Sequence, residues 1–172
     1  MRLISCESAH ASAILAILNE AIANSTALYD YKPRTAAMMA EWFEAKRRGS
    51  YPVIGVVDDA GQLLGFGSYG PFRAWPAYKY SVEHSLYVER SQRRQGVGRL
   101  LLAELIACAR RQDYHLLIGG IDAHNAASIA LHRRLGFELC AHIRQAGFKF
   151  NRWLDLQFYQ LILDTPRQPL DG

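Results

Sequence analysis

Cysteine is scarce in this chain. Its three cysteines, Cys6, Cys108 and Cys140, lie far apart in the 172 residues, and an odd, scattered set fits neither a disulfide framework nor a cysteine-rich zinc site. The paired spacing of metal ligands is also missing from the histidines His10, His115, His124 and His142. We therefore expect a reducing, cytoplasmic location and no metal cofactor.

Long apolar runs are missing as well. No window approaches the length of a membrane span. The opening residues, MRLISCESAHAS, have few apolar side chains before polar ones, unlike a secretory signal. We expect neither membrane insertion nor secretion.

Charge is not concentrated in one sign. Lys and Arg number 20 against 16 Asp and Glu, which gives a net charge of +4 and a pI near 9.1. Nucleic-acid-binding proteins show a denser basic stripe, so we expect no nucleic-acid partner. The hydrophobic content of 50% suffices for one full core, which predicts a single domain over residues 1–164 and a disordered tail over 165–172.

The most informative segment is EHSLYVERSQRRQGVG, residues 83–98, in which a β-patterned stretch enters a glycine-spaced helix start. Gly96 and Gly98 lack a Cβ, so a diphosphate can approach the unpaired amides of the first helical turn. Positive charge is added by Arg93, Arg94 and Arg99. The alternative is a tight turn with solvated arginines.

The spacing narrows the ligand class. It lacks the GxxxxGK[ST] of a P-loop, and it lacks the full GxGxxG with a downstream acid of a dinucleotide-binding unit. A nucleoside triphosphate or a nicotinamide cofactor is therefore disfavoured.

A second motif, NAASIALHRRLGF, follows at residues 125–137. Asn125 is a good helix N-cap, and Gly136 is typical of a helix end. Together with RRQGVG at 93–98, which matches [QR]xxGx[GA], this order resembles the GNAT family of N-acetyltransferases. In that family the first loop binds the pyrophosphate of acetyl-CoA.

The resemblance implies a co-substrate, acetyl-CoA, and a set of residues that bind it. The backbone of β-patterned residues would pair with pantetheine, the glycine loop would hold the diphosphate, and the start of the second motif would bind the pantetheine arm. These residues are Leu86, Tyr87, Val88, Arg93, Arg94, Gln95, Gly96, Val97, Gly98, Arg99, Asn125 and Ser128.

The segments SYGPFRAWPAYKYSVEHSLYV, LHRRLGF and AGFKFNRWLDLQFYQL resemble a narrower subgroup, the phosphinothricin and methionine sulfoximine or sulfone N-acetyltransferases. The resemblance implies a homodimer, antibiotic or herbicide resistance, and Glu83 as catalytic base. The implied substrate contacts are Arg73, Ala74, Trp75, Tyr78, Glu83, His84 and Ser85.

The elements read from the pattern predict an α/β (α+β) fold. We expect helices from Ser8 and over 35–48, 97–112 and from Asn125. Expected strands cover 2–6, 51–57, 63–69, 78–88, 114–121, 137–146 and 153–163. Alternation of strand and helix between 78 and 121 implies a parallel pair. By resemblance, the sheet is mixed, largely antiparallel and flanked by helices, and the parallel pair splays apart to admit pantetheine.

Glu83 is the leading candidate for the base, because a carboxylate on a partly buried strand can have its pKa raised by desolvation. In a regular strand Glu83 and His84 point to opposite faces. The alternative for Glu83 is a plain ion pair with Arg73 or Lys79.

Two further residues have open roles. His132, where many family members have a tyrosine, could protonate the leaving thiolate as a second catalytic residue or satisfy a core hydrogen bond. Arg73, in the proline-flanked PFRAWP, could clamp an acidic substrate or be an exposed loop residue.

The hypothesis is therefore direct transfer of an acetyl group from acetyl-CoA to the α-amino group of a small amino-acid analogue, within a ternary complex. Two alternatives remain. One is acetylation of another small or macromolecular amine: a protein N-terminus, a polyamine or an aminoglycoside. The other is a regulatory dimer that binds coenzyme A without catalysis.

Overall fold

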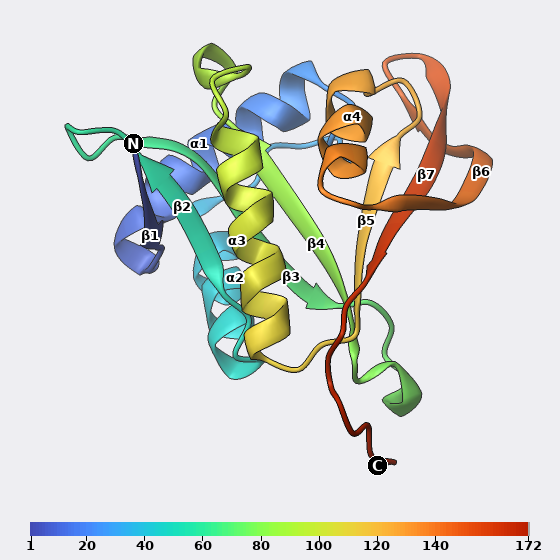
Figure 1. Ribbon diagram of the computed structural model, residues 1–172. Helices are drawn as coiled ribbons and strands as arrows, with labels where there is room; N and C mark the ends of the chain where they lie inside the picture. The colour runs from blue at the N-terminus through green and yellow to red at the C-terminus, as the bar shows by residue number, and fades with distance from the viewer. Residues whose placement is uncertain (172) are drawn as a thin grey trace.

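The computed structural model describes residues 1–171, which form one seven-stranded sheet with helices on both faces (Figure 1). The strands lie in the order β1-β2-β3-β4-β5-β7-β6. Their bounds are β1 Arg2–Ser5, β2 Val53–Val57, β3 Leu63–Pro71, β4 Ser81–Val88, β5 Leu116–Asp122, β6 Glu138–Lys149 and β7 Arg152–Ile162.

Four α-helices cover the sheet within the described residues: α1 (Ala11–Asn24), α2 (Ala36–Arg48), α3 (Val97–Arg111) and α4 (Ala126–Arg134). In Figure 1, α3 and α4 lie in front of the sheet and α1 and α2 behind it. Each face has its own hydrophobic core, one built around Leu101, Leu105 and Leu117 and the other around Ile14, Leu18 and Phe66.

All neighbouring strands pair antiparallel except β4 and β5, which are parallel. This pairing ends at His84 and Gly119, although β4 continues to Val88 and β5 to Asp122. The two strands therefore separate over their last residues, which leaves the facing edges free of sheet hydrogen bonds. The predicted mixed sheet with a splayed parallel pair is confirmed.

Local sequence signals placed several elements correctly. Thr35 caps α2 by accepting a hydrogen bond from the Met38 amide. The hairpin between β2 and β3 turns through Gly61, whose φ is +84°. Gly136, with φ +89°, follows α4 as predicted.

The largest errors in the expected boundaries are the start of α1, the start of β4 and the end of β6, which runs to Lys149 instead of residue 146. Ser8 does not cap α1, because residues Ser8–His10 form a 3-10 turn closed by Glu7 and His10, and α1 begins only at Ala11. The strand expected from residue 78 begins at Ser81, since Pro76 starts a 3-10 turn over Pro76–Tyr78.

The β6–β7 hairpin is fastened to the segment after α1. Lys149 is 4% exposed, and its Nζ donates hydrogen bonds to the carbonyl oxygens of Ile22, Ser25 and Leu28 at 2.7, 2.9 and 2.7 Å. The Tyr31 hydroxyl donates to the Phe148 carbonyl at 2.6 Å. These contacts fix the loop over residues 25–31, which forms a wall of the cavities described below.

The residues after Asp164 contain no helix or strand up to residue 171. They still contact the domain, because the Thr165 hydroxyl donates to the Tyr114 carbonyl and the Leu170 amide to the Tyr80 hydroxyl at 3.1 Å. The domain boundary at 164 stays a prediction. None of the helices in the described part of the chain has both the length and the apolar character needed to cross a bilayer.

Candidate active site

A groove of about 1130 Å³ lies beside the separated ends of β4 and β5. The loop before α3 and the exposed side of α4 border it, and the segment after α1 closes it. The predicted cofactor residues that line it are Leu86, Tyr87, Val88, Arg93, Arg94, Gly96, Gly98, Arg99, Asn125 and Ser128. Gln95 and Val97 are not among the lining residues.

The start of α3 depends on a left-handed turn. Arg94 and Gly96 have φ values of +66° and +87°, and the first helical hydrogen bonds come from the amides of Arg99 and Leu100 to the Gly96 carbonyl, at 3.0 and 3.1 Å. The amides before Arg99 therefore lie outside the helical ladder. A Cβ on Gly96 would meet no atom within 4 Å, so the backbone is open to a ligand here.

Charge around this turn is unevenly placed. Arg93 pairs with Glu20 of α1 at 3.1 Å, so part of its charge is neutralised. Arg94 and Arg99 line the groove and are exposed. Gln95 points elsewhere and donates to the Ser91 carbonyl at 3.2 Å, while the Val97 side chain is buried in the core. The side chains of Gln95 and Val97 therefore do not line the groove, and only their backbone amides remain available to an anion.

The second motif lies across the groove from the glycine turn. Asn125 caps α4, since its Oδ1 accepts a hydrogen bond from the Ser128 amide at 3.1 Å. Gly98 approaches this helix closely, and a Cβ there would lie 3.2 Å from Leu131 Cδ2. The two motifs, almost thirty residues apart in sequence, therefore form the two sides of one groove.

A second, smaller cavity of about 230 Å³ shares Leu86, Tyr87, Asn125 and Ser128 with the groove. Its lining also includes Glu83, His84 and Ser85 from β4. A long ligand in the groove can thus reach the predicted base at the bottom of the gap between the strands.

Glu83 points to the face of the sheet that carries α1 and α2. Its Oε1 lies 3.2 Å from the position of a Cβ on Gly120. Burial raises the pKa of the Glu83 carboxyl, and the positive charge of Arg73 partly opposes this rise. Among the ion pairs found in residues 1–171, none involves Glu83, so the simple ion-pair alternative finds no support.

His84 points to the opposite face, as the strand alternation predicted, and contacts His132. Their Nε2 atoms are 2.9 Å apart, and His132 Nδ1 lies 2.7 Å from the Ser128 carbonyl oxygen. Because a carbonyl only accepts, Nδ1 of neutral His132 carries its proton, and His84 donates between the two rings. A Cβ on Gly119 would lie 2.8 Å from His84 Cε1, so the pair requires glycine there.

This tautomer bears on the general-acid role of His132. Burial lowers the pKa of both imidazoles, and His132 further lowers the pKa of His84. Neutral His132 has no proton on Nε2 to give to a thiolate. Its general-acid role therefore stays a prediction that requires a second proton.

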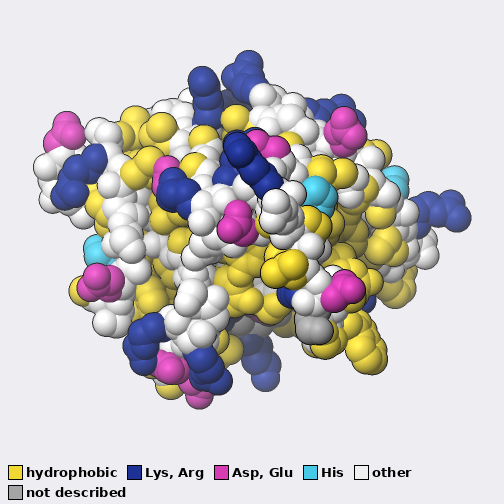
Figure 2. Space-filling view, turned by 60° about the horizontal axis from the view of Figure 1, so that its bottom comes forward, with side chains coloured by type: hydrophobic (Ala, Val, Ile, Leu, Met, Phe, Trp, Pro, Cys, Tyr) yellow, Lys and Arg dark blue, Asp and Glu magenta, His cyan; other side chains and the backbone are white. Residues whose placement is uncertain are grey.

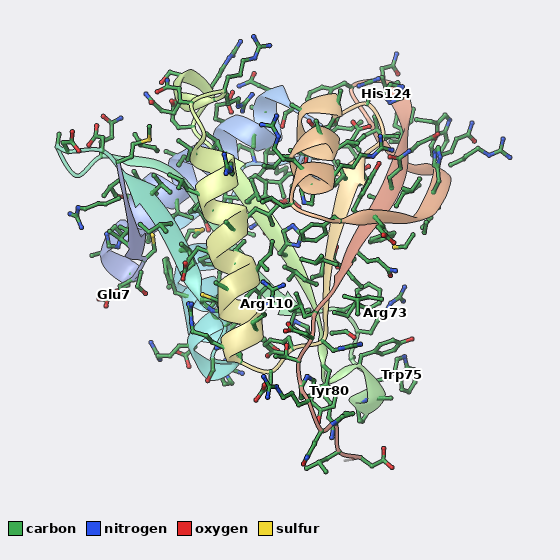
Figure 3. All side chains as sticks on the ribbon, viewed as in Figure 1. Glu7, Arg73, Trp75, Tyr80, Arg110 and His124 are labelled. Carbon is green, nitrogen blue, oxygen red and sulfur yellow. The ribbon has the colours of Figure 1, made fainter. Side chains whose placement is uncertain are left out.

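The structure does not bring the predicted substrate loop into the cavity. Arg73 and Trp75 lie at the opposite end of β5 from His124 (Figure 3), and Trp75 is 73% exposed. Arg73 stacks on the Phe72 ring at 5.2 Å. Ala74 and Tyr78 are exposed in the same loop, and none of these four residues lines the cavity.

Sequence reasoning missed several cavity residues, notably Tyr29 and Asp122. Asp122 ends a strand just before the Asn125 motif, a position at which a polar residue could have been noticed. Tyr29 lies in a loop without a recognisable motif. Among the described residues, no group of three His, Cys, Asp or Glu side chains is placed to hold a metal.

The fold, the glycine turn and the splayed strands together define an acetyltransferase of the GNAT family. The model of the acetyltransferase (GNAT) family matches residues 17–137, and the chain belongs to this family. It is an N-acetyltransferase by this membership and by its relatives.

One relative of known activity and two solved structures are similar to this chain over nearly its whole length. An L-methionine sulfoximine/L-methionine sulfone acetyltransferase of Pseudomonas paraeruginosa is 47% identical over 154 residues, 90% of each chain. An N-acetyltransferase of Staphylococcus aureus Mu50 has a TM-score of 0.92 at 43% identity, covering 94% of this chain and 97% of that one. A phosphinothricin acetyltransferase of Sinorhizobium meliloti, solved with acetyl-CoA, has a TM-score of 0.95 at 34% identity, covering 99% and 94%.

Proposed function

We propose that this protein transfers the acetyl group of acetyl-CoA to the α-amino group of a small amino-acid analogue such as methionine sulfone, methionine sulfoximine or L-phosphinothricin. The observation that carries the proposal is that two spaces adjoin. One is a groove that begins at the left-handed turn before α3, and the other is a cavity lined by Glu83, a partly buried carboxylate without an ion-pair partner among the described residues. Relatives that act on these substrates support the same substrate class.

The groove suits acetyl-CoA in its chemistry. The turn at Gly96 presents backbone without side-chain cover, and Arg94 and Arg99 supply positive charge for a diphosphate. The free edge of β4 over Leu86, Tyr87 and Val88 offers amides and carbonyls to an extended pantetheine chain, with Asn125 and Ser128 opposite. Bound there, acetyl-CoA supplies an activated thioester.

Glu83 acts as the base in this proposal. An α-amine is mostly protonated near neutral pH, and the Glu83 carboxylate takes one proton from it, directly or through a water. A carbon–nitrogen bond then forms and the carbon–sulfur bond breaks. The nitrogen loses a second proton, the thiolate gains one, and the proton on Glu83 returns to solvent, so the products are the amide and free coenzyme A.

We propose that Arg73 forms an ion pair with the acidic group of the substrate. We also propose that the protein is a homodimer. Large apolar side chains are well exposed at Trp75, Ile162 and Leu170, and Figure 2 shows hydrophobic side chains reaching the surface in a broad area of the lower face. Such an area is typical of an interface. Acetylation of an antibiotic-like analogue would then give antibiotic or herbicide resistance, which growth on phosphinothricin tests.

Thiol release from acetyl-CoA tests the activity. The panel contains methionine sulfone, methionine sulfoximine, phosphinothricin, common amino acids, a polyamine, an aminoglycoside and a peptide with a free N-terminus. We expect saturable release with the first three compounds. Saturation only by polycationic amines or by the peptide would assign another acceptor, and acetyl-CoA binding without any release would favour a regulatory protein.

A further inference from the structure

Three buried polar side-chain atoms lack a hydrogen-bond partner among residues 1–171, and all three belong to residues that line the small cavity. They are the Tyr29 hydroxyl, His84 Nδ1 and Asp122 Oδ2. The side chain of Asp122 is only 1% exposed. A buried carboxylate oxygen without a donor is costly in a folded protein, so its retention points to a ligand that supplies the donor.

The local turn explains only one of the two Asp122 oxygens. Oδ1 accepts a hydrogen bond from the His124 amide at 2.9 Å, and His124 Nδ1 lies 3.4 Å from the same oxygen. The Asp122 backbone carbonyl accepts from the Asn125 amide at 2.8 Å. These contacts stabilise the turn before α4, and none of them involves Oδ2.

Asp122 and Glu83 lie on the same face of the sheet. Glu83 pairs with Ile118 in the parallel register, and side chains at 118, 120 and 122 share one face of β5. Gly120 between them leaves the Glu83 carboxylate close to the backbone, with Oε1 3.2 Å from the position of a Cβ. The two carboxyl groups thus flank a position that has no side chain.

Tyr29 approaches this face from the loop that Lys149 holds. Its ring lies over Gly147, where a Cβ would come within 2.7 Å of Cε2. Burial raises the pKa of the Tyr29 hydroxyl, and the nearby charges of Asp122 and Asp155 raise it further. The hydroxyl therefore stays protonated and lies within the influence of the Asp122 carboxylate.

We propose that Asp122 Oδ2 and the Tyr29 hydroxyl oxygen bind the primary ammonium group of the acceptor and present it to Glu83. This subsite rests on the proposed function and adds its amine-recognition residues. An ammonium has three N–H donors, and the cavity supplies three oxygen acceptors from Asp122, Tyr29 and Glu83. A 2-hydroxy acid offers a single donor at the same carbon and is held poorly.

The test compares Asp122→Asn with the wild-type protein. The asparagine Oδ1 still accepts the His124 amide, so the turn is kept, while Oδ2 becomes an NH₂ donor. We expect the KM for methionine sulfone to rise at least about 30-fold, as for loss of one partner of a buried charge pair. The KM for acetyl-CoA should stay within about twofold of the wild-type value, a change worth less than 0.5 kcal/mol.

A competition arm separates ammonium recognition from general damage. The 2-hydroxy analogue of methionine sulfone is used as an inhibitor, and its inhibition constant should change less than about threefold in Asp122→Asn, because it has no ammonium to lose. Tyr29→Phe should raise the KM for the amine at least about tenfold, the loss of one hydrogen bond to a charged group. It also keeps the proposal testable if Asp122→Asn fails to fold.

Asp155→Asn is the matched control, because Asp155 also lies near Tyr29 but both of its oxygens are occupied, by the Gln145 amide and by His142. It should leave the KM for the amine unchanged. Wild-type activity together with an unchanged KM in Asp122→Asn and Tyr29→Phe would overturn the subsite alone, as would equal losses for the amine and its hydroxy analogue. No thiol release by the wild-type protein with any amine would overturn the proposed function as well.

Discussion

The groove and the cavity of this protein are built in different ways. One end of the groove, where we propose that the diphosphate binds, is formed by one continuous segment, and its main feature is exposed backbone around Gly96 and Gly98. The cavity collects side chains from the loop after α1, from β4, from β5 and from α4. We therefore expect backbone conformation to control cofactor binding, and side-chain chemistry to control the amine and the transfer.

The largest effect is expected from Glu83→Gln. Loss of the base should lower kcat about 10²- to 10⁴-fold, the usual contribution of general base catalysis. Acetyl-CoA binding should not change, since Glu83 does not line the groove. Thiol-release kinetics and a calorimetric titration measure the two quantities, and retained turnover would contradict the assignment of Glu83.

On the groove side, Gly96→Ala should weaken acetyl-CoA binding roughly tenfold, about the loss of one hydrogen bond to a charged group. The left-handed backbone at φ +87° should also cost about 1–2 kcal/mol of folding stability.

Gly61→Ala is the control for Gly96→Ala. Gly61 has φ +84°, and a Cβ there also meets no atom within 4 Å. Thermal melts should show similar losses of stability in both variants, but only Gly96→Ala should lose affinity. Equal affinities for acetyl-CoA in the two variants would show that the turn does not bind the ligand.

On the cavity side, Lys149→Met removes the ammonium that binds three carbonyls at the end of α1. Unsatisfied buried acceptors should cost roughly 1–3 kcal/mol of stability, and the released loop carrying Tyr29 should raise the KM for the amine. Lys46→Met is the control, because Lys46 Nζ donates to the Tyr69 carbonyl at 2.7 Å and Lys46 does not line the cavity. Its Nζ lies beside Gly70, which pairs with Glu83, so its loss can change kcat but should leave the KM for the amine unchanged. A similar rise of KM in both variants would argue against a specific role of the loop.

The smallest effect concerns pH. Because burial raises the pKa of Glu83, activity should fall on the acid side at a higher pH than for an exposed glutamate. The positive charge of Arg73 lowers this pKa, so Arg73→Gln should move the acid limb of kcat/KM to still higher pH. Salt should move the wild-type limb in the same direction by screening Arg73, and an unmoved limb in the variant would contradict this coupling.

Much of the fold and of the groove followed from local sequence signals. The glycine turn, the cap at Asn125 and the stop at Gly136 are short-range features, and the structure has each of them. The alternation along β4 placed Glu83 and His84 on opposite faces. Such features depend on neighbouring residues in the chain, so the sequence carries them directly.

The cavity was harder to predict because it depends on contacts between distant segments. Lys149 lies more than 120 residues from the carbonyls it binds, and Tyr29 and Asp122 line the same cavity only through tertiary packing. The tautomer of His132 also depends on His84 from another strand. No pattern within a short stretch of the sequence predicts these long-range contacts.

The central claim is that the groove at residues 93–98 binds acetyl-CoA independently of the carboxylate that activates the amine. Calorimetric titration of acetyl-CoA into the wild-type protein and into Glu83→Gln tests this claim directly. We predict saturable binding with one site per chain and equal affinity in the two proteins. Absence of binding heat in the folded wild-type protein, together with no displacement of a fluorescent coenzyme A analogue, would contradict it.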